Sequence, residues 1–479
     1  MKAVGLVTEY NPLHKGHILH LDTSMELSGA DVSVAVMSGD FVQRGEPAII
    51  DKYTRTKWAV DCGVNLVVEL PVKFALANAE QFATGAVLTL NALGVDAISF
   101  GSESGSITDM DYIADILANE SDIYQLALKK ELKSGASFPL ARENAIASMN
   151  VMDKELLHSL LASPNNILGI EYLKAIKRHA CPITPHTFKR EGMRYNETFD
   201  DNSKESVYAS AEALRHEIRR YCLAMDELAS DIGTQDTDNY DAMIFETNDI
   251  LQNIIKYIPE PSLDSFLNEM DKSMPIYKED FNSIFNAKLR KILRDCNYNR
   301  KEAANVLLKY DGFNENLANR LIKYYDKNYD IDEFINLIND KSSTYTAISR
   351  AIFKFILGHK KNTRSEIDGT DIINDSDDDD IDGMLDNFKY GNISYVRILG
   401  LDDKGMEYLN TIRKSVPVPI ITKTAGFENL LSDDIYASDL YNLAVWNVFE
   451  EDVPDEFHKG IYIKGKGFTG DPGEPVSNF

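Results

Sequence analysis

Two histidines near the start of the chain, His14 and His17, stand three residues apart with Gly16 between them. They follow the apolar run Ala3–Val7 and the turn signal Asn11-Pro12. This order predicts a strand, a tight turn and a helix that opens near Gly16 or His17. Residues three apart lie on one helix face, so both imidazoles can hold the same group. The N–H groups and dipole of a helix start favour a polyphosphate, which can approach closely at Gly16.

The histidine pair has two other interpretations, as metal ligands or as ordinary surface residues. Its position favours a nucleotide, because doubly wound sheets bind ligands at strand-to-helix junctions. Adenylyl transfer needs the α-phosphate held in line with a nucleophile, and charge stabilised as pyrophosphate departs. His14 and His17 have the chemistry to donate to those phosphate oxygens. His20, one turn further on, is expected to pack or to face solvent.

The first hundred residues alternate short β-rich runs with helical patterns, which predicts βαβ units and a parallel sheet. The β-rich runs are Lys2–Thr8, Asp31–Ser38, Asn65–Leu70 and Asp96–Phe100. Polar or glycine-rich residues follow each run. Because the carboxyl ends of parallel strands meet at one edge of a sheet, we expect these loops to converge on one crevice.

Four further segments offer polar groups to this crevice: Ser38–Pro47, Ser163–Gly169, Thr187–Glu191 and Tyr208–Arg215. In the second segment, one asparagine is expected to cap a helix and the other to be free for a ligand. Arg190 and Arg215 are phosphate-binding candidates. Each segment also has a plain interpretation as a solvated connection, a helix cap or an exposed charge run. Arg55 and Lys57 are expected to face solvent.

The patterning predicts four parts of the chain. Residues 1–225 form an α/β, Rossmann-like domain with a parallel sheet, and residues 226–364 a helical domain. Residues 365–385, rich in aspartate, form a linker or loop. Residues 386–479 form a small C-terminal α/β domain.

Composition limits the class of protein. No apolar run is long enough to span a bilayer, so no membrane partner is expected. The four scattered cysteines indicate reduced thiols in a cytoplasmic protein, and neither a zinc site nor a disulfide framework. The net charge of −26 argues against a nucleic-acid partner, although a whole-chain sum can conceal a local basic surface.

Taken together, the motifs resemble the HxGH nucleotidyltransferase superfamily and, more narrowly, the bacterial tRNA-Met cytidine acetate ligases. The matching stretches are Thr8–His20, Met37–Pro47, Phe100–Glu103 and Pro164–Gly169, with weaker matches in Gly312–Leu357 and Tyr395–Gly400. The resemblance implies an enzyme that condenses acetate with ATP, giving acetyl-adenylate and pyrophosphate. It then passes the acetyl group to N4 of the wobble cytidine of elongator tRNA-Met.

The resemblance also implies site residues. His14 and His17 would be catalytic, and residues 1–225 would be the ATP-binding, catalytic domain. Mg²⁺ would arrive with the nucleotide, and no metal ligands of the protein's own are expected. ATP would contact Val7, Thr8, Glu9, Tyr10, Asn11, Pro12, Leu13, His14, Lys15, Gly16, His17, Ile18, Leu19, His20, Gly101, Asn165, Arg190 and, as a neighbour of Arg190, Glu191.

The chain departs from the family pattern at three places. Glu212 stands where a small hydroxyl residue is usual, Lys341–Thr346 is less basic than its counterpart, and the aspartate-rich stretch near 375–382 looks like an insertion. The helical domain is a candidate for tRNA binding. Candidate RNA-facing clusters are Lys177, Arg178, Lys189, Arg190 and Arg194; Lys288, Arg290, Lys291 and Arg294; and Lys354, Lys360, Lys361 and Arg364.

Two other functions use the same features. An adenylyltransferase for a small phosphorylated metabolite would share the histidine chemistry but would leave some 250 C-terminal residues without a role. A non-enzymatic RNA- or protein-binding module is the third possibility, since a fold alone does not fix function.

Overall fold

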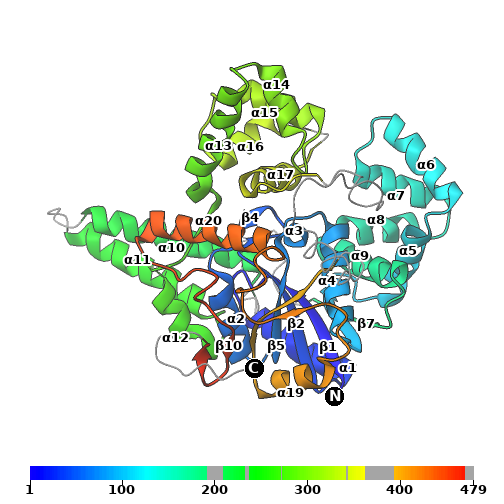
Figure 1. Cartoon of the computed structure of the whole chain (residues 1–479), viewed down its shortest axis with the longest axis horizontal. Helices are drawn as coiled ribbons and strands as arrows, with labels where there is room; N and C mark the ends of the chain where they lie inside the picture. The colour runs from blue at the N-terminus through cyan, green and yellow to red at the C-terminus, as the bar shows by residue number, and fades with distance from the viewer. Residues whose placement is uncertain (191–208, 232–236, 271, 341–342, 362–392, 470–479) are drawn as a thin grey trace.

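The computed structural model describes residues 1–190, 209–231, 237–270, 272–340, 343–361 and 393–469. Within them, nine strands form one mixed sheet in the order β11-β10-β8-β5-β2-β1-β6-β7, with β9 beside β8 (Figure 1). A separate two-stranded hairpin pairs β3 with β4. The expected α/β fold with a largely parallel sheet is confirmed.

The central strands β1 (Ala3–Thr8), β2 (Val32–Ser38) and β5 (Leu66–Leu70) are buried, valine-rich runs that pair in parallel, as expected for a sheet covered on both faces. Strand β6 (Ala97–Ser102) pairs in parallel with β1, and the partly exposed edge strand β7 (Thr184–Lys189) pairs in parallel with β6. The helices between them are α1 (Lys15–Ser28), α2 (Lys52–Asp61), α3 (Val72–Ala75) and α4 (Ala79–Ala92). The strand order reverses between β1 and β6, and a crevice forms at such a point.

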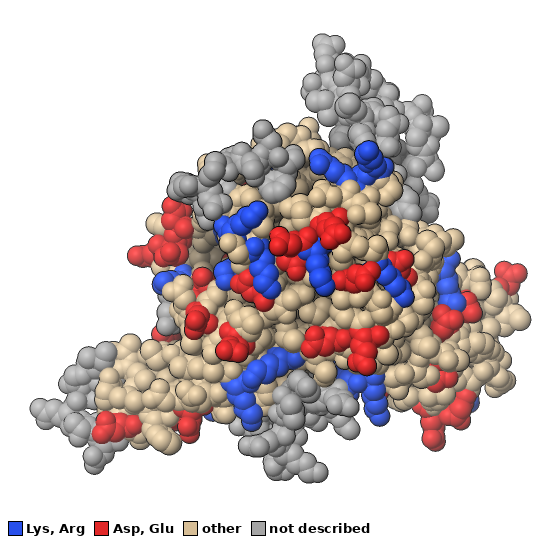
Figure 2. Space-filling view, turned by 90° about the horizontal axis from the view of Figure 1, so that it is seen from below, with Lys and Arg blue, Asp and Glu red and all other residues tan. Residues whose placement is uncertain are grey.

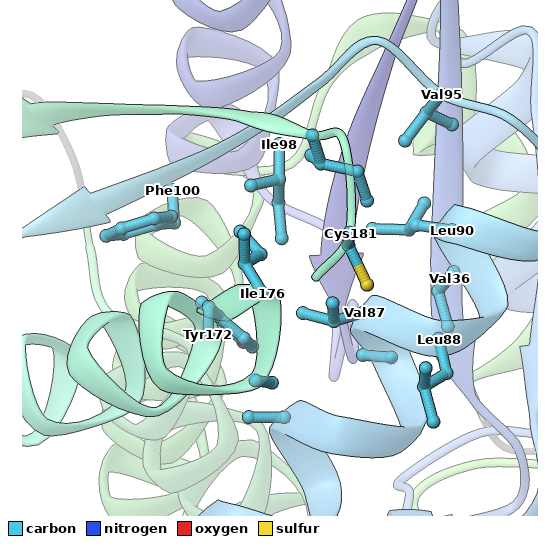
Figure 3. Packing of buried hydrophobic residues seen from close by; sticks show 14 of the residues in the cluster. Val36, Val87, Leu88, Leu90, Val95, Ile98, Phe100, Tyr172, Ile176 and Cys181 are labelled. Carbon is cyan, nitrogen blue, oxygen red and sulfur yellow. The ribbon is translucent and has the colours of Figure 1, made fainter. Parts of the chain in front are cut away.

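The largest core lies where α4 and α9 (Pro164–Arg178) pack on the sheet. Figure 3 shows Val87 and Leu90 of α4 on one side of Ile98 of β6, and Tyr172 and Ile176 of α9 on the other side of this residue. A helical group precedes α9: α5 (Ile107–Asn119), α6 (Asp122–Lys133), α7 (Phe138–Ser148) and α8 (Lys154–Ala162). This packing fixes α9, whose first residues reach the crevice.

The C-terminal segment contains strands and a helix, as expected for an α/β unit, but its strands do not form an independent sheet. Strand β8 (Val396–Leu401) pairs antiparallel with β5 and so continues the central sheet. Helix α19 (Asp403–Ile412) and the short strands β9 (Ile420–Ile421), β10 (Tyr462–Ile463) and β11 (Gly467–Phe468) complete this extension. The expectation of a separate domain at 386–479 is corrected, because β8 belongs to the central sheet. There it covers the edge of β5, which would otherwise be exposed.

The boundary predicted at residue 225 falls inside helix α10 (Ala211–Asp231), which runs on past it. Helices α11 (Thr237–Ile255) and α12 (Glu260–Glu269) follow, and a second core is formed by η1 (Lys278–Phe281), α13 (Asn282–Asp295), α14 (Arg300–Leu307), α15 (Glu315–Tyr324), α16 (Ile331–Ile338), α17 (Tyr345–Leu357) and α20 (Ser432–Phe449). The helical region is therefore not closed on itself, because α20 comes from the C-terminal segment. The predicted linker at 365–385 lies outside the described residues.

The hairpin of β3 (Phe41–Val42) and β4 (Glu46–Pro47) ties this second core to the sheet. The Phe41 ring packs against Phe281 and Phe353, with ring centroids 5.5 and 5.7 Å apart. At the turn, Gly45 has φ +80° and its carbonyl accepts a hydrogen bond from Ser349 of α17. Helix α17 is thereby held over the carboxyl ends of the strands (Figure 1).

Gly45→Ala should therefore loosen α17. A Cβ at this position would overlap the backbone nitrogen of Arg350 and lie 2.7 Å from its Cα. Gly29→Ala is the matched control, since Gly29 has φ +58° but nothing within 4 Å of its Cβ position. Both substitutions carry the left-handed penalty of about 1–2 kcal/mol. We expect Gly45→Ala to cost at least about 1 kcal/mol more by urea unfolding; equal losses would contradict the contact.

No helix among the described residues is long and apolar enough to cross a membrane. The face seen in Figure 2 carries lysine and arginine side chains interspersed with aspartate and glutamate. That face does not present a uniformly basic surface.

Candidate active site

A cavity of about 520 Å³ opens at the carboxyl ends of β1 and β6, the expected crevice. Most of the predicted ligand-binding residues line it. They are Val7, Thr8, Glu9, Tyr10, Asn11, His14, Gly16, His17, Leu19, His20, Gly101, Asn165 and Arg190. A volume of this size is ordinary for a small-molecule or cofactor site.

The two histidines form the start of α1 itself. His14 is the N-cap residue, and its Nδ1 accepts a hydrogen bond from the Gly16 N–H at 3.0 Å. His17 reaches back, and its Nδ1 accepts from the His14 N–H at 3.2 Å. The helix thus begins at Lys15, slightly before the predicted start. The two rings lie side by side, with centroids 3.8 Å apart.

This capping fixes the protons of both rings. Because each Nδ1 accepts from a backbone N–H, the neutral imidazole carries its proton on Nε2. Burial, followed by the charges of Arg190 and Arg215, lowers the pKa of His14 to about 3. Burial and the neighbouring His14 hold the pKa of His17 well below its usual value. The site therefore offers two neutral Nε2–H donors at neutral pH.

His20 has the same neutral state for another reason. Its Nε2 lies 3.1 Å from the Ser99 carbonyl, which can only accept, so Nε2 donates. Burial lowers the pKa of His20 to about 4. His20 lines the cavity, so neither packing in the core nor facing bulk solvent fully describes its position.

Neutral buried histidines make stability depend on pH. In the unfolded chain a histidine binds its proton near pH 6.5, whereas in the fold His14 and His20 stay neutral down to about pH 3 to 4. The unfolded state therefore binds more protons over this range, and stability falls as the pH is lowered from 7.5 to 5.5. We expect the urea midpoint to fall over this interval, and to fall less in His20→Asn. Identical profiles would contradict the assignment.

The backbone before the helix is held by a buried arginine. Tyr10 has a left-handed φ of 49°, and the Asn11-Pro12 peptide is cis. The Arg55 guanidinium donates to the carbonyls of Glu9 at 2.7 Å and Ser38 at 3.0 Å. Arg55 is fully buried, so the expectation that it faces solvent is wrong. It joins the carboxyl ends of β1 and β2, where free carbonyls need donors.

At the β6 end of the cavity, Gly101, Asn165 and Arg190 come together as predicted. Asn165 Oδ1 accepts from Arg190 Nη1 at 3.1 Å, and Asn165 Nδ2 donates to Glu103 at 2.7 Å. Neither asparagine caps α9, because Ser163 is the N-cap position and Pro164 the first helical residue. Asn166 instead accepts from the Ser104 N–H, so the capping prediction is corrected.

The profile of the HIGH Nucleotidyl Transferase family matches this chain over residues 1–374 and 370–454. The tRNA(Met) cytidine acetate ligase of Thermoanaerobacter sp. (strain X514) is 35% identical over 455 residues, covering 93% of this chain and 96% of that protein. The tRNA(Met) cytidine acetate ligase of Acetivibrio thermocellus is 34% identical, covering 97% and 100%. This chain belongs to that ligase family.

The ligase family also accounts for the whole fold. Thermotoga maritima TmcAL bound with alpha-thio ATP superposes with a TM-score of 0.76 at 28% identity, covering 97% of this chain and 99% of that one. The apo form of TmcAL gives a TM-score of 0.77 with the same coverage. The resemblance read from the short motifs is thus confirmed over nearly the full length.

Several residues of this ligase-family cavity were not named as nucleotide contacts from the sequence. Thr346 and Arg350 of α17 line it, some 300 residues away from the histidines in the chain. Arg215, a phosphate-binding candidate from the sequence, also lines it and donates to the Asn11 carbonyl at 2.9 Å, while Ser210 caps α10, as its plain interpretation predicted. Glu212, the departure from the family pattern, pairs with Arg44 at 3.4 Å.

Some predicted contacts lie away from the cavity. Leu13 is buried in the core, Ile18 packs against it, and Pro12 does not line the cavity. Lys15 is exposed, and its ammonium donates to the Lys256 carbonyl. Glu191 lies outside the described residues.

Several candidate RNA-facing cations are already paired within the fold. Lys177 pairs with Asp111 and Asp115, and Arg178 with Glu80 and Glu120. In the other clusters, Lys291 and Arg294 pair with Asp295, and Lys354 pairs with Asp311. Local pairing explains these charges without RNA. Arg194 and Arg364 lie outside the described residues.

Proposed function

We propose that this chain is an ATP-dependent ligase that activates acetate as acetyl-adenylate and transfers the acetyl group to N4 of the wobble cytidine of elongator tRNA-Met. N4-acetylcytidine, AMP and pyrophosphate are the products. Membership of the ligase family supports this reaction. The observation that carries the chemistry is the pair of neutral Nε2–H donors at the start of α1, in a cavity large enough for a nucleotide.

In the first step, an acetate oxygen attacks the α-phosphorus of ATP, and the bond to pyrophosphate breaks. Negative charge builds on the phosphate oxygens at this moment. His14 and His17 donate from Nε2 without having to lose or gain a proton, and the start of α1 adds its dipole. Gly101, Asn165 and Arg190 would hold the nucleotide at the β6 end, and Arg215 adds positive charge beside the histidines.

Mg²⁺ is proposed to enter with ATP. Among the described residues, no group of three or more histidine, cysteine, aspartate or glutamate side chains is arranged to hold a metal ion. The cation would therefore be held chiefly by phosphate oxygens and water, and would neutralise charge on the triphosphate.

In the second step, N4 of the cytidine attacks the acyl carbon of acetyl-adenylate, and AMP leaves. The helical region is the proposed route for tRNA, because α17 carries Thr346 and Arg350 into the cavity wall. A substrate that contacts these helices is then close to the acyl group. Cytidine at the tip of an exposed anticodon loop is accessible in the way that this requires.

The first step can be tested without tRNA. We expect the protein with ATP, Mg²⁺ and labelled pyrophosphate to form labelled ATP only when acetate is present. Nicotinamide mononucleotide and phosphopantetheine are the control substrates. Exchange that is independent of a carboxylate, or turnover of either control, would exclude the ligase.

A further inference from the structure

Glu9 is the single acidic side chain among the described residues that line the cavity. A negative charge is out of place beside a triphosphate unless it has a role there, since like charges repel. Glu9 follows β1 directly, five residues before His14. The position of Glu9 in the cavity therefore indicates a function other than binding phosphate.

The Glu9 carboxylate is firmly placed. Its Oε1 accepts a hydrogen bond from the Gln43 N–H at 2.9 Å, and Arg55 holds its backbone carbonyl. No lysine, arginine or histidine lies within ion-pair distance of it among the described residues. A carboxylate that is held by one neutral donor and has no cationic partner keeps oxygen lone pairs available.

Glu9 and Gln43 line the cavity away from the Gly101, Asn165 and Arg190 group. Gln43 lies in the turn of the β3–β4 hairpin that comes after β2, on one side of β1, whereas Gly101 lies in β6 and Arg190 directly follows β7, on the other side. Ala79 and Phe82 add apolar surface to the cavity wall, and the Gln43 side chain reaches the Ala77 carbonyl just before them. This end suits the acetyl group and the base that receives it.

The transfer step requires a proton acceptor. The cytidine N4 loses a proton when it becomes an amide nitrogen, and the paired histidines cannot take it, because each Nδ1 already accepts from a backbone N–H and each Nε2 carries a proton. His20 is likewise a donor, to the Ser99 carbonyl. We propose that Glu9 is the catalytic base that accepts the N4 proton during acetyl transfer.

The step balances as follows. The N4–acyl carbon bond forms while the bond between the acyl carbon and the AMP oxygen breaks. The electron pair of that bond leaves with AMP, and the N4 proton passes to a Glu9 oxygen and then to water. This role rests on the proposed ligase reaction, but it concerns only the second half of it.

The surroundings of Glu9 suit a base. Burial raises its pKa above the usual value, against the Gln43 hydrogen bond, so its affinity for a proton is greater than that of a solvated carboxylate. The charged or titratable groups that face it from neighbouring elements are Arg44 and Glu46 of the hairpin, Arg55 of α2, Tyr172 of α9 and Arg215 of α10. Transfer should rise with pH through the raised pKa, as Glu9 loses its proton.

Glu9→Gln tests the proposal, because its amide oxygen can still accept from Gln43. Enzyme loaded with ATP and labelled acetate is mixed with tRNA, and labelled tRNA is followed in a single turnover from pH 4.5 to 8.5. We expect transfer to become about 10²–10⁴-fold slower, a far larger loss than that of acetate-dependent pyrophosphate exchange, and to lose its pH-dependent rise. Glu9→Asp should restore part of the transfer rate.

Glu46→Gln is the control, since it removes a neighbouring carboxylate that does not line the cavity; we expect its pH-dependent rise to persist. Transfer by Glu9→Gln at the wild-type rate would overturn the proposal. Loss of exchange together with transfer would also overturn it, by assigning Glu9 to ATP or Mg²⁺ binding. Absence of acetate-dependent exchange in the wild-type protein would instead mean that the proposed ligase function has failed.

Discussion

Replacing His14 with asparagine should abolish most of the acetate-dependent exchange and leave the protein folded. The asparagine Oδ1 can take the place of Nδ1 as acceptor for the Gly16 N–H, so the cap of α1 is kept. The Nε2–H donor is lost. Removing one such donor from a charge-stabilising site costs about 10²–10³-fold in rate. Exchange rate and urea midpoint are measured on the same preparation.

A second replacement at the same position separates the two roles of the ring. His14→Gln places an amide nitrogen near the position of Nε2, but it has no acceptor at the position of Nδ1 to cap the helix. We expect it to keep more exchange than His14→Asn while being less stable, by about 1 kcal/mol. His158→Asn, on the exposed surface of α8, should change neither property. If His14→Asn retained full exchange, adenylyl transfer would not depend on the histidine donors.

The second large effect is expected at Lys52, on stability. This fully buried ammonium contacts Glu69 at 2.7 Å and Glu456 at 2.9 Å, and Arg397 also pairs with both carboxylates. The cluster joins α2 and β5 to β8 and the C-terminal segment. Removing one partner from a buried network leaves charges uncompensated, so Lys52→Met should cost about 3–5 kcal/mol.

Lys57 provides the matched comparison, because it lies on the same helix and pairs with Asp61 at a partly exposed position. Lys57→Met should cost less than about 1 kcal/mol. Both variants are compared by urea unfolding at pH 7.5. Similar losses in the two variants would show that the buried cluster does not hold the C-terminal strands in the sheet.

The local parts of the site could be predicted because their signals are short in sequence. The run Ala3–Val7, the Asn11-Pro12 turn and the histidine spacing each act over a few residues, and the structure places β1 and α1 within two residues of the expected bounds. Parallel topology predicted that the loop at Gly101 would meet the loop after β1, whereas Asn165 was placed there only by the family resemblance. Capping was harder, since Asn165 and Asn166 found partners in another loop instead of their own helix.

Contacts between distant segments could not be predicted from one sequence. Arg55 was expected to be an exposed helix residue, yet it is buried because it donates hydrogen bonds to the carbonyls at the ends of β1 and β2. Arg350 enters the cavity wall only because Gly45 allows α17 to approach the hairpin closely. Likewise, nothing local in the residues Val396–Leu401 revealed that this strand would pair with β5.

Labelled oxygen gives the most direct test of the central claim, that acetate is activated as an adenylate before the cytidine attacks. The protein is incubated with ATP, Mg²⁺, tRNA and acetate that carries ¹⁸O at both carboxylate oxygens. The masses of AMP, acetylated cytidine and pyrophosphate are then measured by mass spectrometry. One ¹⁸O should appear in AMP and one in the acetyl group on cytidine, with none in pyrophosphate. Label in pyrophosphate or inorganic phosphate, or acetylated cytidine formed with unlabelled AMP, would contradict the account.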